Sequence, residues 1–324
     1  MTEAPPAPSL STMWAMQPRF ERDLGAFMER AAELGYQGIE INHSMDPEQI
    51  GAILAIHSLP VTGVHAPAPL ARHATLGWNR ELNIASTDET ERTAAVEAHV
   101  QSVELAAQAG ARHVVVHLGA VGKRALAGER RLRSLYERQP AGDVEGRSGA
   151  VTTFREEWEG AVDQTLRERA AMAAPYLANA RRSLDVLAER AQARGVAIGL
   201  ECRLHYHEIP LPQECVDLIA PYPSTVAGYL HDVGHAEVLH RLGLVDRATW
   251  FDLLGDRVVG MHLHDVRRLT DHRAPGNGDV DYAWLAARIP ATAARTFEID
   301  QHESDADVAS ALELLRAAGV VGRS

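Results

Sequence analysis

Acidic and imidazole side chains stand at the ends of several apolar runs in the sequence. Glu201 closes the run VAIGLE, Asp232 closes VAGYLHD, and Glu298 lies in TFEID. The run VVGMHLHD carries two histidines, His262 and His264. Carboxylate oxygens and imidazole nitrogens are ligands of divalent cations, and burying several carboxylates together without a cation is costly. If these runs are neighbouring strands, the pattern predicts a metal site; a set of solvated strand ends is the alternative.

The elements that must position these side chains alternate along the chain. Eight short apolar runs are separated by amphipathic stretches, such as TAAVEAHVQSVELAAQAG and DVASALELLRAAG, which end in Gly as helices often do. Strands that alternate with helices form parallel sheets, and eight such units close into a (β/α)8 TIM barrel with its active site at the carboxyl ends of the strands. We therefore predict this α/β fold, with strands that begin at Leu10, Gly38, Val61, His113, Val196, Val226, Val258 and Thr296.

The composition fits a single globular domain. The chain has 324 residues, of which 46% are hydrophobic, and a formal net charge of -12. An acidic surface does not favour a polyanion, so nucleic acid is not the expected partner. Two cysteines without a CxxC pattern favour a reducing, cytoplasmic location, and no apolar run is long enough to span a membrane. We expect a flexible tail over residues 1–8, without signal-peptide features, and the barrel domain over residues 9–320.

One segment interrupts the alternation of strands and helices. Between the fourth predicted strand and its helix, an insertion of about residues 121–160 exceeds the usual length of a βα loop. It begins with a basic helical piece that includes Arg130, Arg131 and Arg133, and it continues into the Gly-rich stretch AGDVEGRSGA. A solvated charged face is one interpretation. Because an insertion after a barrel strand lies on the catalytic side, a lid with a Gly-rich hinge or a homo-oligomer contact is the other.

Several motifs together resemble those of the xylose isomerase-like barrel superfamily, which includes sugar phosphate isomerases and epimerases and the endonuclease IV-type abasic-site nucleases. They are ELGYQGIEIN, GVHAP, VVVHLG, GLE, HDVGHA, HLHD followed by PGNGDVDY, and FEI. The resemblance implies that one divalent ion, Mn²⁺, Mg²⁺, Co²⁺ or Zn²⁺, is held by Glu201, Asp232, His262 and Glu298. It also implies that His235, three residues after Asp232, contacts the substrate.

A site of this kind implies proton-transfer chemistry on a small carbohydrate. A cation bound to the carbonyl and the neighbouring hydroxyl of an open-chain sugar acidifies the C–H between them and stabilises the enediolate. Glu201 and Glu298 are the predicted acid and base that exchange this proton. Its return to the adjacent carbon isomerises the sugar, sugar phosphate or keto-polyol, and its return to the opposite face epimerises it. Loss of a β-hydroxyl would give dehydration instead, and the sequence does not choose among these outcomes.

Further polar residues are weaker candidates for the substrate pocket. His65 and His117 end the third and fourth predicted strands, where a substrate contact or a core role is favoured over an additional zinc ion. Glu40 ends the second strand and either contacts the substrate or organises the barrel floor. Arg268 and Arg273 follow the seventh strand and suit a bidentate phosphate or carboxylate contact, with a surface position as the alternative. The loop after the fifth strand adds polar residues that face either the pocket or solvent: Arg203, His205, His207 and Glu208.

Two other classes of function stay open. A phosphodiesterase acting on damaged DNA would need a cluster of zinc ions, for which His65, His117 and His272 occupy suitable positions, and the insertion is basic. Against this class, Thr270 stands where the nuclease pattern has an Asp ligand, and the chain is acidic overall. A barrel that binds a metabolite without catalysis is the other class, which the presence of all four candidate ligands opposes.

Overall fold

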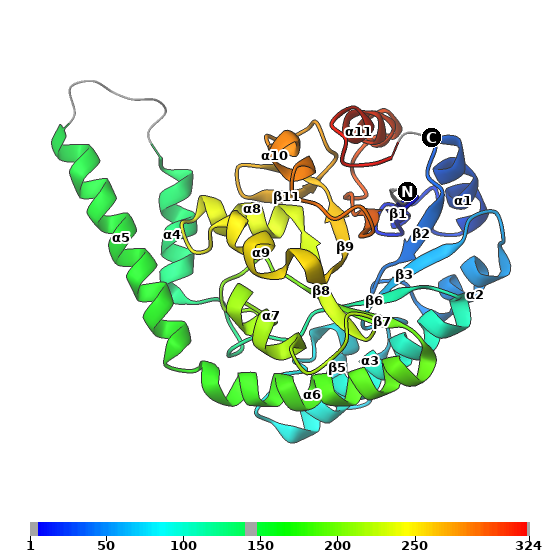
Figure 1. The fold of residues 1–324 in the computed structure, drawn as a ribbon, viewed down its shortest axis with the longest axis horizontal. Helices are drawn as coiled ribbons and strands as arrows, with labels where there is room; N and C mark the ends of the chain where they lie inside the picture. The colour runs from blue at the N-terminus through cyan, green and yellow to red at the C-terminus, as the bar shows by residue number, and fades with distance from the viewer. Residues whose placement is uncertain (1–5, 140–147, 323–324) are drawn as a thin grey trace.

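The structure is a computed structural model that describes residues 6–139 and 148–322. Eight parallel strands close into a barrel, in which neighbouring strands follow one another in chain order (Figure 1). These strands are β1 (Pro8–Ser11), β2 (Gly38–Ile41), β3 (Val61–His65), β6 (His113–Val116), β7 (Ala197–Glu201), β8 (Ala227–Asp232), β9 (Val258–Leu263) and β12 (Ala294–Phe297). The predicted TIM barrel is confirmed, and each of the eight apolar runs contributes one barrel strand.

The first strand differs from its prediction in both bounds. It begins two residues before Leu10 and ends at Ser11, whereas the predicted run LSTMWA continues to residue 15. The Ser11 hydroxyl accepts the backbone N–H of Met13 at 3.2 Å, and the Ser11 carbonyl accepts that of Trp14 at 3.2 Å, so the chain turns here. The Trp14 side chain is fully buried in the core. Its burial therefore explains the apolar pattern without a longer strand.

Helices cover the outside of the barrel. Two long helices, α3 (Glu89–Ala109) and α6 (Ala173–Arg194), pack against each other, and each ends at a glycine in the left-handed conformation, Gly110 and Gly195. The others that surround the barrel are α1 (Leu24–Glu33), α2 (Pro47–Ala55), α7 (Pro212–Ile219), α8 (Val233–Arg241), α9 (Arg247–Leu254), α10 (Tyr282–Ala286) and α11 (Asp305–Ala317). Over residues 6–139 and 148–322, none of the helices has the length and apolar character of a membrane span.

Two short antiparallel hairpins extend from the barrel. One joins β4 (Arg72–His73) to β5 (Gly77–Trp78), and the other joins β10 (Asp265–Arg267) to β11 (Thr270–Arg273). The second hairpin follows β9 directly. Its strand β11 is tied to the segment after β12, because the backbone N–H of Asp300 donates to the His272 carbonyl at 2.8 Å. The chain beyond β9 is thereby held at the carboxyl ends of the strands.

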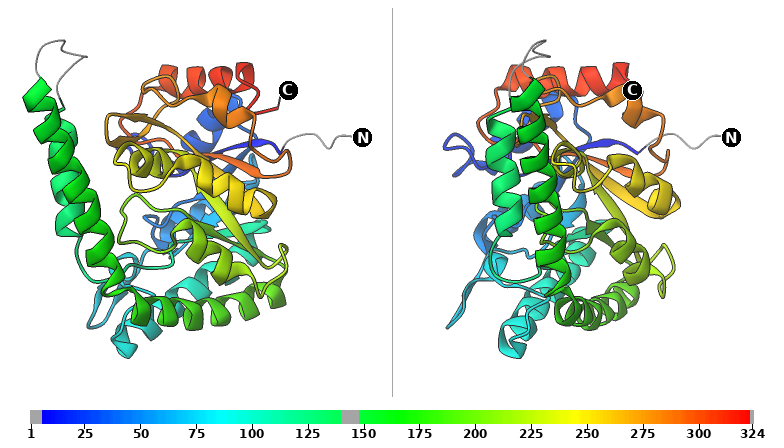
Figure 2. Two further views of the ribbon diagram at one scale, coloured as in Figure 1. Left: turned by 60° about the vertical axis from the view of Figure 1, so that its left-hand side comes forward. Right: turned by 90° about the vertical axis from the view of Figure 1, so that its left-hand side faces the viewer.

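The insertion after β6 forms a helical hairpin of α4 (Ala127–Glu137) and α5 (Ser148–Ala170). It lies on the side of the barrel opposite the N-terminus, which is the side of the strands' carboxyl ends (Figure 2). Leu132 and Leu135 of α4 share an apolar cluster with Val238 of α8 and Val266 of β10. The helices extend past residue 160, the end predicted for the insertion. Most of the Gly-rich stretch lies outside the described residues, and a lid or subunit contact stays a prediction.

Candidate active site

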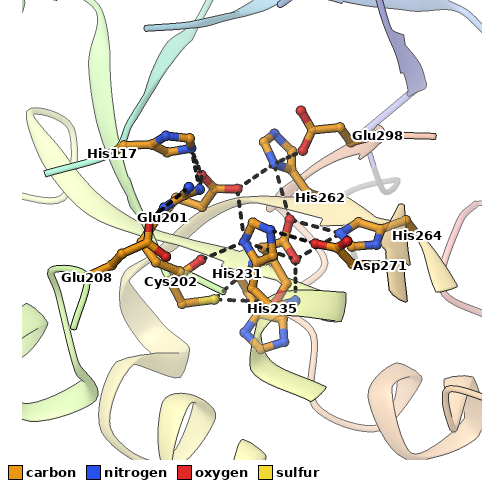
Figure 3. Close-up of polar contacts among 12 residues, drawn as sticks. His117, Glu201, Cys202, Glu208, His231, His235, His262, His264, Asp271 and Glu298 are labelled. Atoms are coloured by element: carbon orange, nitrogen blue, oxygen red, sulfur yellow. Dashed lines mark hydrogen bonds and ion pairs between the residues drawn. The ribbon is translucent and has the colours of Figure 1, made fainter. Parts of the chain in front are cut away.

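Three carboxylates, from the ends of three barrel strands, surround one nitrogen of His262, which lies in a fourth strand. Glu201 ends β7, Asp232 ends β8, His262 lies in β9, and Glu298 follows β12 directly. The His262 Nδ1 atom lies 2.9 Å from Glu201 Oε1 and 2.9 Å from Glu298 Oε2 (Figure 3). The same nitrogen lies 3.6 Å from Asp232 Oδ2, and all four residues are buried. The structure therefore brings together the four residues predicted as metal ligands.

The imidazole of His262 supplies one positive charge among three buried carboxylates and offsets only part of their negative charge. Burial alone would lower the pKa of His262, but Glu298 and Glu40 raise it well above its ordinary value. Burial would likewise raise the pKa of Glu298, yet His262 holds it well below its ordinary value. Positive charge is required here because isolated carboxylates are costly to bury. Glu201, His262 and Glu298 lie close enough together, with His65, to hold a divalent cation, which would replace the proton on Nδ1. Asp232 lies beside this group, with its Oδ2 at 3.6 Å from the same nitrogen.

Glu40 holds His262 from the barrel interior. The His262 Nε2–H donates to Glu40 Oε1 at 2.9 Å, and Glu40 is fully buried as the next-to-last residue of β2. Burial alone would raise the pKa of Glu40, but His262 lowers it to about 2. A carboxylate that accepts a hydrogen bond from the Nε2–H of an imidazole fixes the orientation of the ring and leaves Nδ1 as the atom that can bind a metal. Glu40 does not line the pocket described below, so its placement agrees with the alternative role on the barrel floor.

The HDVGHA motif is a strand end followed at once by a helix start. Asp232 is the last residue of β8 and the N-cap of α8, and its Oδ1 accepts the backbone N–H of His235 at 2.7 Å. An N-cap side chain bonds the third residue of its helix, so the spacing of three brings both residues to the barrel mouth. The His235 Nδ1–H donates to the Cys202 carbonyl at 3.1 Å. The His235 Nε2 atom faces Asp271, 3.5 Å from its Oδ2.

His264 links Asp232 to the β10–β11 hairpin. Its Nε2–H donates to the Asp232 carboxylate at 2.9 Å, and its Nδ1 accepts the backbone N–H of His272 at 2.8 Å. The ring is thereby fixed at both nitrogens and orients the carboxylate. Gly234 makes room for this ring, because a Cβ at that position would lie 2.1 Å from His264 Cε1.

The β10–β11 hairpin adds a carboxylate that the sequence analysis did not place. Asp271 Oδ2 lies 3.3 Å from His272 Nδ1. Burial alone would raise the pKa of Asp271, but hydrogen bonds from His235 and His272 hold it well below its ordinary value. Thr270 itself carries no carboxylate, as the sequence analysis noted, but the neighbouring Asp271 does, and it lines the pocket described below. The adjacent pair Asp271–His272 reaches the site because His272 has a φ of 55°, in the left-handed region that turns the chain.

A pocket of about 270 Å³ opens at the barrel mouth. His65, His117 and His235, which were predicted to contact substrate, line it together with Glu201 and Glu298. The remaining lining residues come mostly from the loop after β7 and from the β10–β11 hairpin: Met13, His43, Arg203, Leu204, His205, Glu208, Asp271 and His272. The pocket wall is therefore rich in imidazole and carboxylate groups.

Arg203 is a pocket residue that the sequence left undecided. Its Nη1 donates to Glu201 Oε2 at 2.9 Å and also contacts His117 Nε2. Its Nη2 lies 3.3 Å from Glu208 Oε1; Glu201, His117 and Glu208 are labelled in Figure 3. Burial would raise the pKa of Glu201, but His117 and Arg203 hold it well below its ordinary value. Burial, reinforced by Arg203, lowers the pKa of His117 well below its ordinary value. Glu201 is therefore ionised, and Arg203 is its permanently charged partner.

The two arginines predicted to bind an anionic group do not line this pocket. Arg268 lies at the tip of the β10–β11 hairpin, where its side chain is 54% exposed and its Nη2 is 3.0 Å from Glu137 Oε2 on α4. Arg273 Nε lies 2.8 Å from Glu303 Oε1. The hairpin turns both side chains away from the barrel mouth. Arg268 and Arg273 are thus engaged in ion pairs outside this pocket, and their predicted substrate contacts stay a prediction.

Comparison with known proteins agrees with this architecture. A family model described as xylose isomerase-like TIM barrel matches residues 28–318. The chain belongs to this family. No curated protein matches the sequence significantly. The resemblance that was based on the strand-end motifs is thus confirmed for the xylose isomerase-like barrel.

Several solved structures share the fold of this xylose isomerase-like barrel. D-allulose 3-epimerase from Methylomonas sp., in complex with D-allulose, has a TM-score of 0.61 at 17% identity, covering 98% of each chain. The 3-keto-D-glucoside 4-epimerase from E. coli has a TM-score of 0.56 at 18% identity, covering 96% of this chain and 99% of the other. A Thermus thermophilus protein soaked with ZnCl₂ has a TM-score of 0.59 at 18% identity, covering 98% of this chain and 100% of the other.

Proposed function

We propose that this protein is a divalent-metal-dependent sugar isomerase or epimerase. The observation that carries the proposal is the placement of Glu201 and Glu298, whose carboxylates each lie 2.9 Å from His262 Nδ1 and both line the pocket. Solved structures of the same fold include D-allulose 3-epimerase with D-allulose bound and a 3-keto-D-glucoside 4-epimerase, which supports a sugar as the substrate class. The substrate is a ketose, a sugar phosphate or a keto-polyol.

The residues that would hold the ion are Glu201, Asp232, His262 and Glu298. When bound there, the ion would act as a Lewis acid that polarises a substrate carbonyl and acidifies the neighbouring C–H. Glu40 and His264 orient the ligands His262 and Asp232 through hydrogen bonds of 2.9 Å each. Ligands held in this way keep their geometry while the substrate enters.

The proton moves between Glu201 and Glu298. Both carboxylates are ionised, because their pKa values lie well below the ordinary range, so either one is able to accept a proton. The carboxylate that removes the proton becomes a carboxylic acid and is able to return this proton to the substrate from its own side. Delivery from the opposite side requires that the other carboxylate first takes a proton from solvent, while the first later releases its proton to solvent. Delivery to the adjacent carbon gives isomerisation, and delivery to the opposite face of the same carbon gives epimerisation. His235, His117 and Arg203 line the pocket and supply polar contacts for the hydroxyl groups.

Two alternatives share this site. Elimination of a β-hydroxyl after the same proton removal would make the protein a dehydratase. A metal-dependent phosphodiesterase is favoured by one further observation, since Asp232, His235, His264 and His272 also lie close enough together to bind an ion. A non-catalytic metabolite-binding barrel would have no use for two ionised carboxylates in its pocket.

Metal analysis with a matched aspartate pair tests the proposal. Purified protein is loaded with Mn²⁺, its bound metal is measured, and ketoses, sugar phosphates and keto-inositols are screened for turnover. We expect about one ion per chain in the wild type and in Asp252→Ala, which changes an exposed residue of α9, and loss of the ion and of turnover in Asp232→Ala. Wild-type metal affinity in Asp232→Ala would refute the ligand assignment. Two or three zinc ions per chain with phosphodiester cleavage would favour the nuclease class.

A further inference from the structure

A second cluster of ligand-type side chains lies where the α4–α5 hairpin meets the barrel rim. Glu129 lies in α4, and His205 and His207 lie in the loop that follows β7. One ligand atom from each of the three residues lies within 4.8 Å of those of the other two. Glu129 is fully buried, and His205 also lines the pocket of the candidate active site. The cluster shares no residue with the four proposed ligands.

The carboxylate of Glu129 is held in a fixed orientation. Its Oε1 accepts the Nδ1–H of His205 at 2.7 Å and the Nε–H of Arg133 at 3.0 Å, and its Oε2 accepts the backbone N–H of Tyr206 at 3.0 Å. Burial would raise the pKa of Glu129, but His205 and Arg133 lower it, so the group is ionised. Replacing the His205 proton with a metal ion would keep the other two hydrogen bonds. Arg133 would then bond the ligating carboxylate from outside, as partners of metal ligands commonly do.

His207 has a ring nitrogen that makes no hydrogen bond to any of the described residues. Its Nδ1 is buried without a hydrogen-bond partner in that part of the chain. A buried polar atom without a partner costs about 1–3 kcal/mol, and it calls for an explanation such as an ion or a water. Burial lowers the pKa of His207, which favours the neutral imidazole that binds metals. The ring lies beside that of His205, with 5.6 Å between the centroids.

We propose that Glu129, His205 and His207 form a second cation site, for Zn²⁺ or a similar ion that binds imidazole. Two imidazoles and one carboxylate are a donor set that suits Zn²⁺ and leaves a fourth position for water, whereas Mg²⁺ and Ca²⁺ prefer oxygen. The proposed site around His262 has more carboxylates and would also accept a harder ion such as Mg²⁺. Both sites could take Zn²⁺, but only the site around His262 would also suit Mg²⁺.

An ion at this site would tie the insertion to the pocket rim. The same loop is already bonded to the region of the insertion, since the Val121 N–H donates to the His207 carbonyl at 2.7 Å and Arg133 Nη2 donates to the Leu204 carbonyl at 2.9 Å. The loop also carries Arg203 and Glu208, which line the pocket. Zinc would thus stabilise the rim that faces the substrate, and its binding would raise the melting temperature of the protein.

Zinc stoichiometry in matched histidine variants tests this site. Metal-free wild type, His207→Ala and the control His240→Ala, whose side chain is 40% exposed, are dialysed against Zn²⁺ and their bound metal is measured. We expect His207→Ala to bind one zinc ion fewer than the other two proteins, or to bind that ion at least about 100-fold more weakly, and to lose the zinc-dependent rise in melting temperature. Equal zinc content and affinity in all three proteins would overturn the proposal.

Three further variants make the result independent of folding and of the proposed function. Glu129→Gln keeps the shape of the carboxylate and is measured alongside, so that a folding failure of His207→Ala does not decide the outcome. Asp232→Ala weakens the site around His262, and it should keep the His207-dependent zinc ion. The double variant Asp232→Ala/His207→Ala should lose that ion as well. Zinc binding that Asp232→Ala alone abolishes completely would also contradict a second site.

Discussion

Replacing Gly234 with alanine should disturb the protein through one side chain, His264. A Cβ at this position would lie 2.1 Å from His264 Cε1 and 2.6 Å from His264 Nδ1, with Val266 Cγ2 at 3.0 Å. The imidazole has no free direction in which to move, because its two nitrogens bond Asp232 and the backbone of His272. Relief of the clash must therefore break a hydrogen bond or displace α8.

The expected cost follows from three contributions. Overpacking in a well-packed core costs about 1–3 kcal/mol, and losing the hydrogen bond from His264 to the ionised Asp232 costs about 1.5–3 kcal/mol. Alanine in place of glycine in a helix returns about 0.5–1 kcal/mol. The net loss of unfolding free energy is thus about 2–5 kcal/mol. Because His264 orients a proposed metal ligand, metal affinity should also fall by about 10–100-fold.

Urea unfolding and metal titration measure the two effects. The control is Gly51→Ala in α2, where an added Cβ meets nothing within 4 Å and the backbone needs no left-handed conformation. This control should be as stable as the wild type or slightly more stable. A Gly234→Ala protein with wild-type unfolding free energy and wild-type metal affinity would refute the packing explanation for the glycine in HDVGHA.

Two further predictions concern acidity and nucleic acid. Burial lowers the pKa of His99 to about 4, so this histidine is neutral in the fold but takes a proton at about pH 6.5 when the chain unfolds. The contribution of the neutral His99 to the unfolding free energy is therefore full above pH 6.5 and is lost as the pH falls toward 4. We expect protonation of His99 in the unfolded chain to lower the unfolding free energy by about 2 kcal/mol between pH 7 and pH 5. In urea unfolding measured at several pH values, His99→Gln should remove this part of the pH dependence. Duplex DNA with an abasic site should not bind appreciably at physiological salt, given the net charge of -12. Tight binding that weakens steeply with salt, and that disappears when Arg130, Arg131 and Arg133 are neutralised, would contradict this expectation.

The sequence predicted the position of a site residue correctly where that position depends only on the strand that carries the residue. Alternating apolar runs and helices predicted the barrel, and parallel strands place their carboxyl ends together, so Glu201, Asp232, His262 and Glu298 could be expected to converge. Their convergence is what the structure contains, while their role as ligands stays a prediction. The spacing of Asp232 and His235 also followed from local chemistry, because an N-cap bonds the third residue of its helix.

The sequence was uninformative where a position depends on a turn or on a partner far along the chain. Asp271 reaches the pocket through the left-handed backbone of His272, and no pattern in the sequence marks that residue. Arg268 points away because Glu137 of α4 pairs with it, across a separation of 131 residues. Arg203 contacts His117, 86 residues earlier in the chain, as well as its sequence neighbours Glu201 and Glu208. Such pairings arise only when the whole chain is folded.

Deuterium exchange with solvent tests the central claim most directly, that Glu201 and Glu298 exchange a proton with the substrate. The protein with Mn²⁺ is incubated in D₂O with D-allulose, D-tagatose and the other sugars of the screen, and label is measured by NMR. We predict deuterium at the carbon next to the carbonyl of at least one sugar. With Glu298→Gln, the rate should fall by about 100- to 10,000-fold, because the amide cannot accept the proton. Exchange at the wild-type rate in Glu298→Gln would contradict the mechanism.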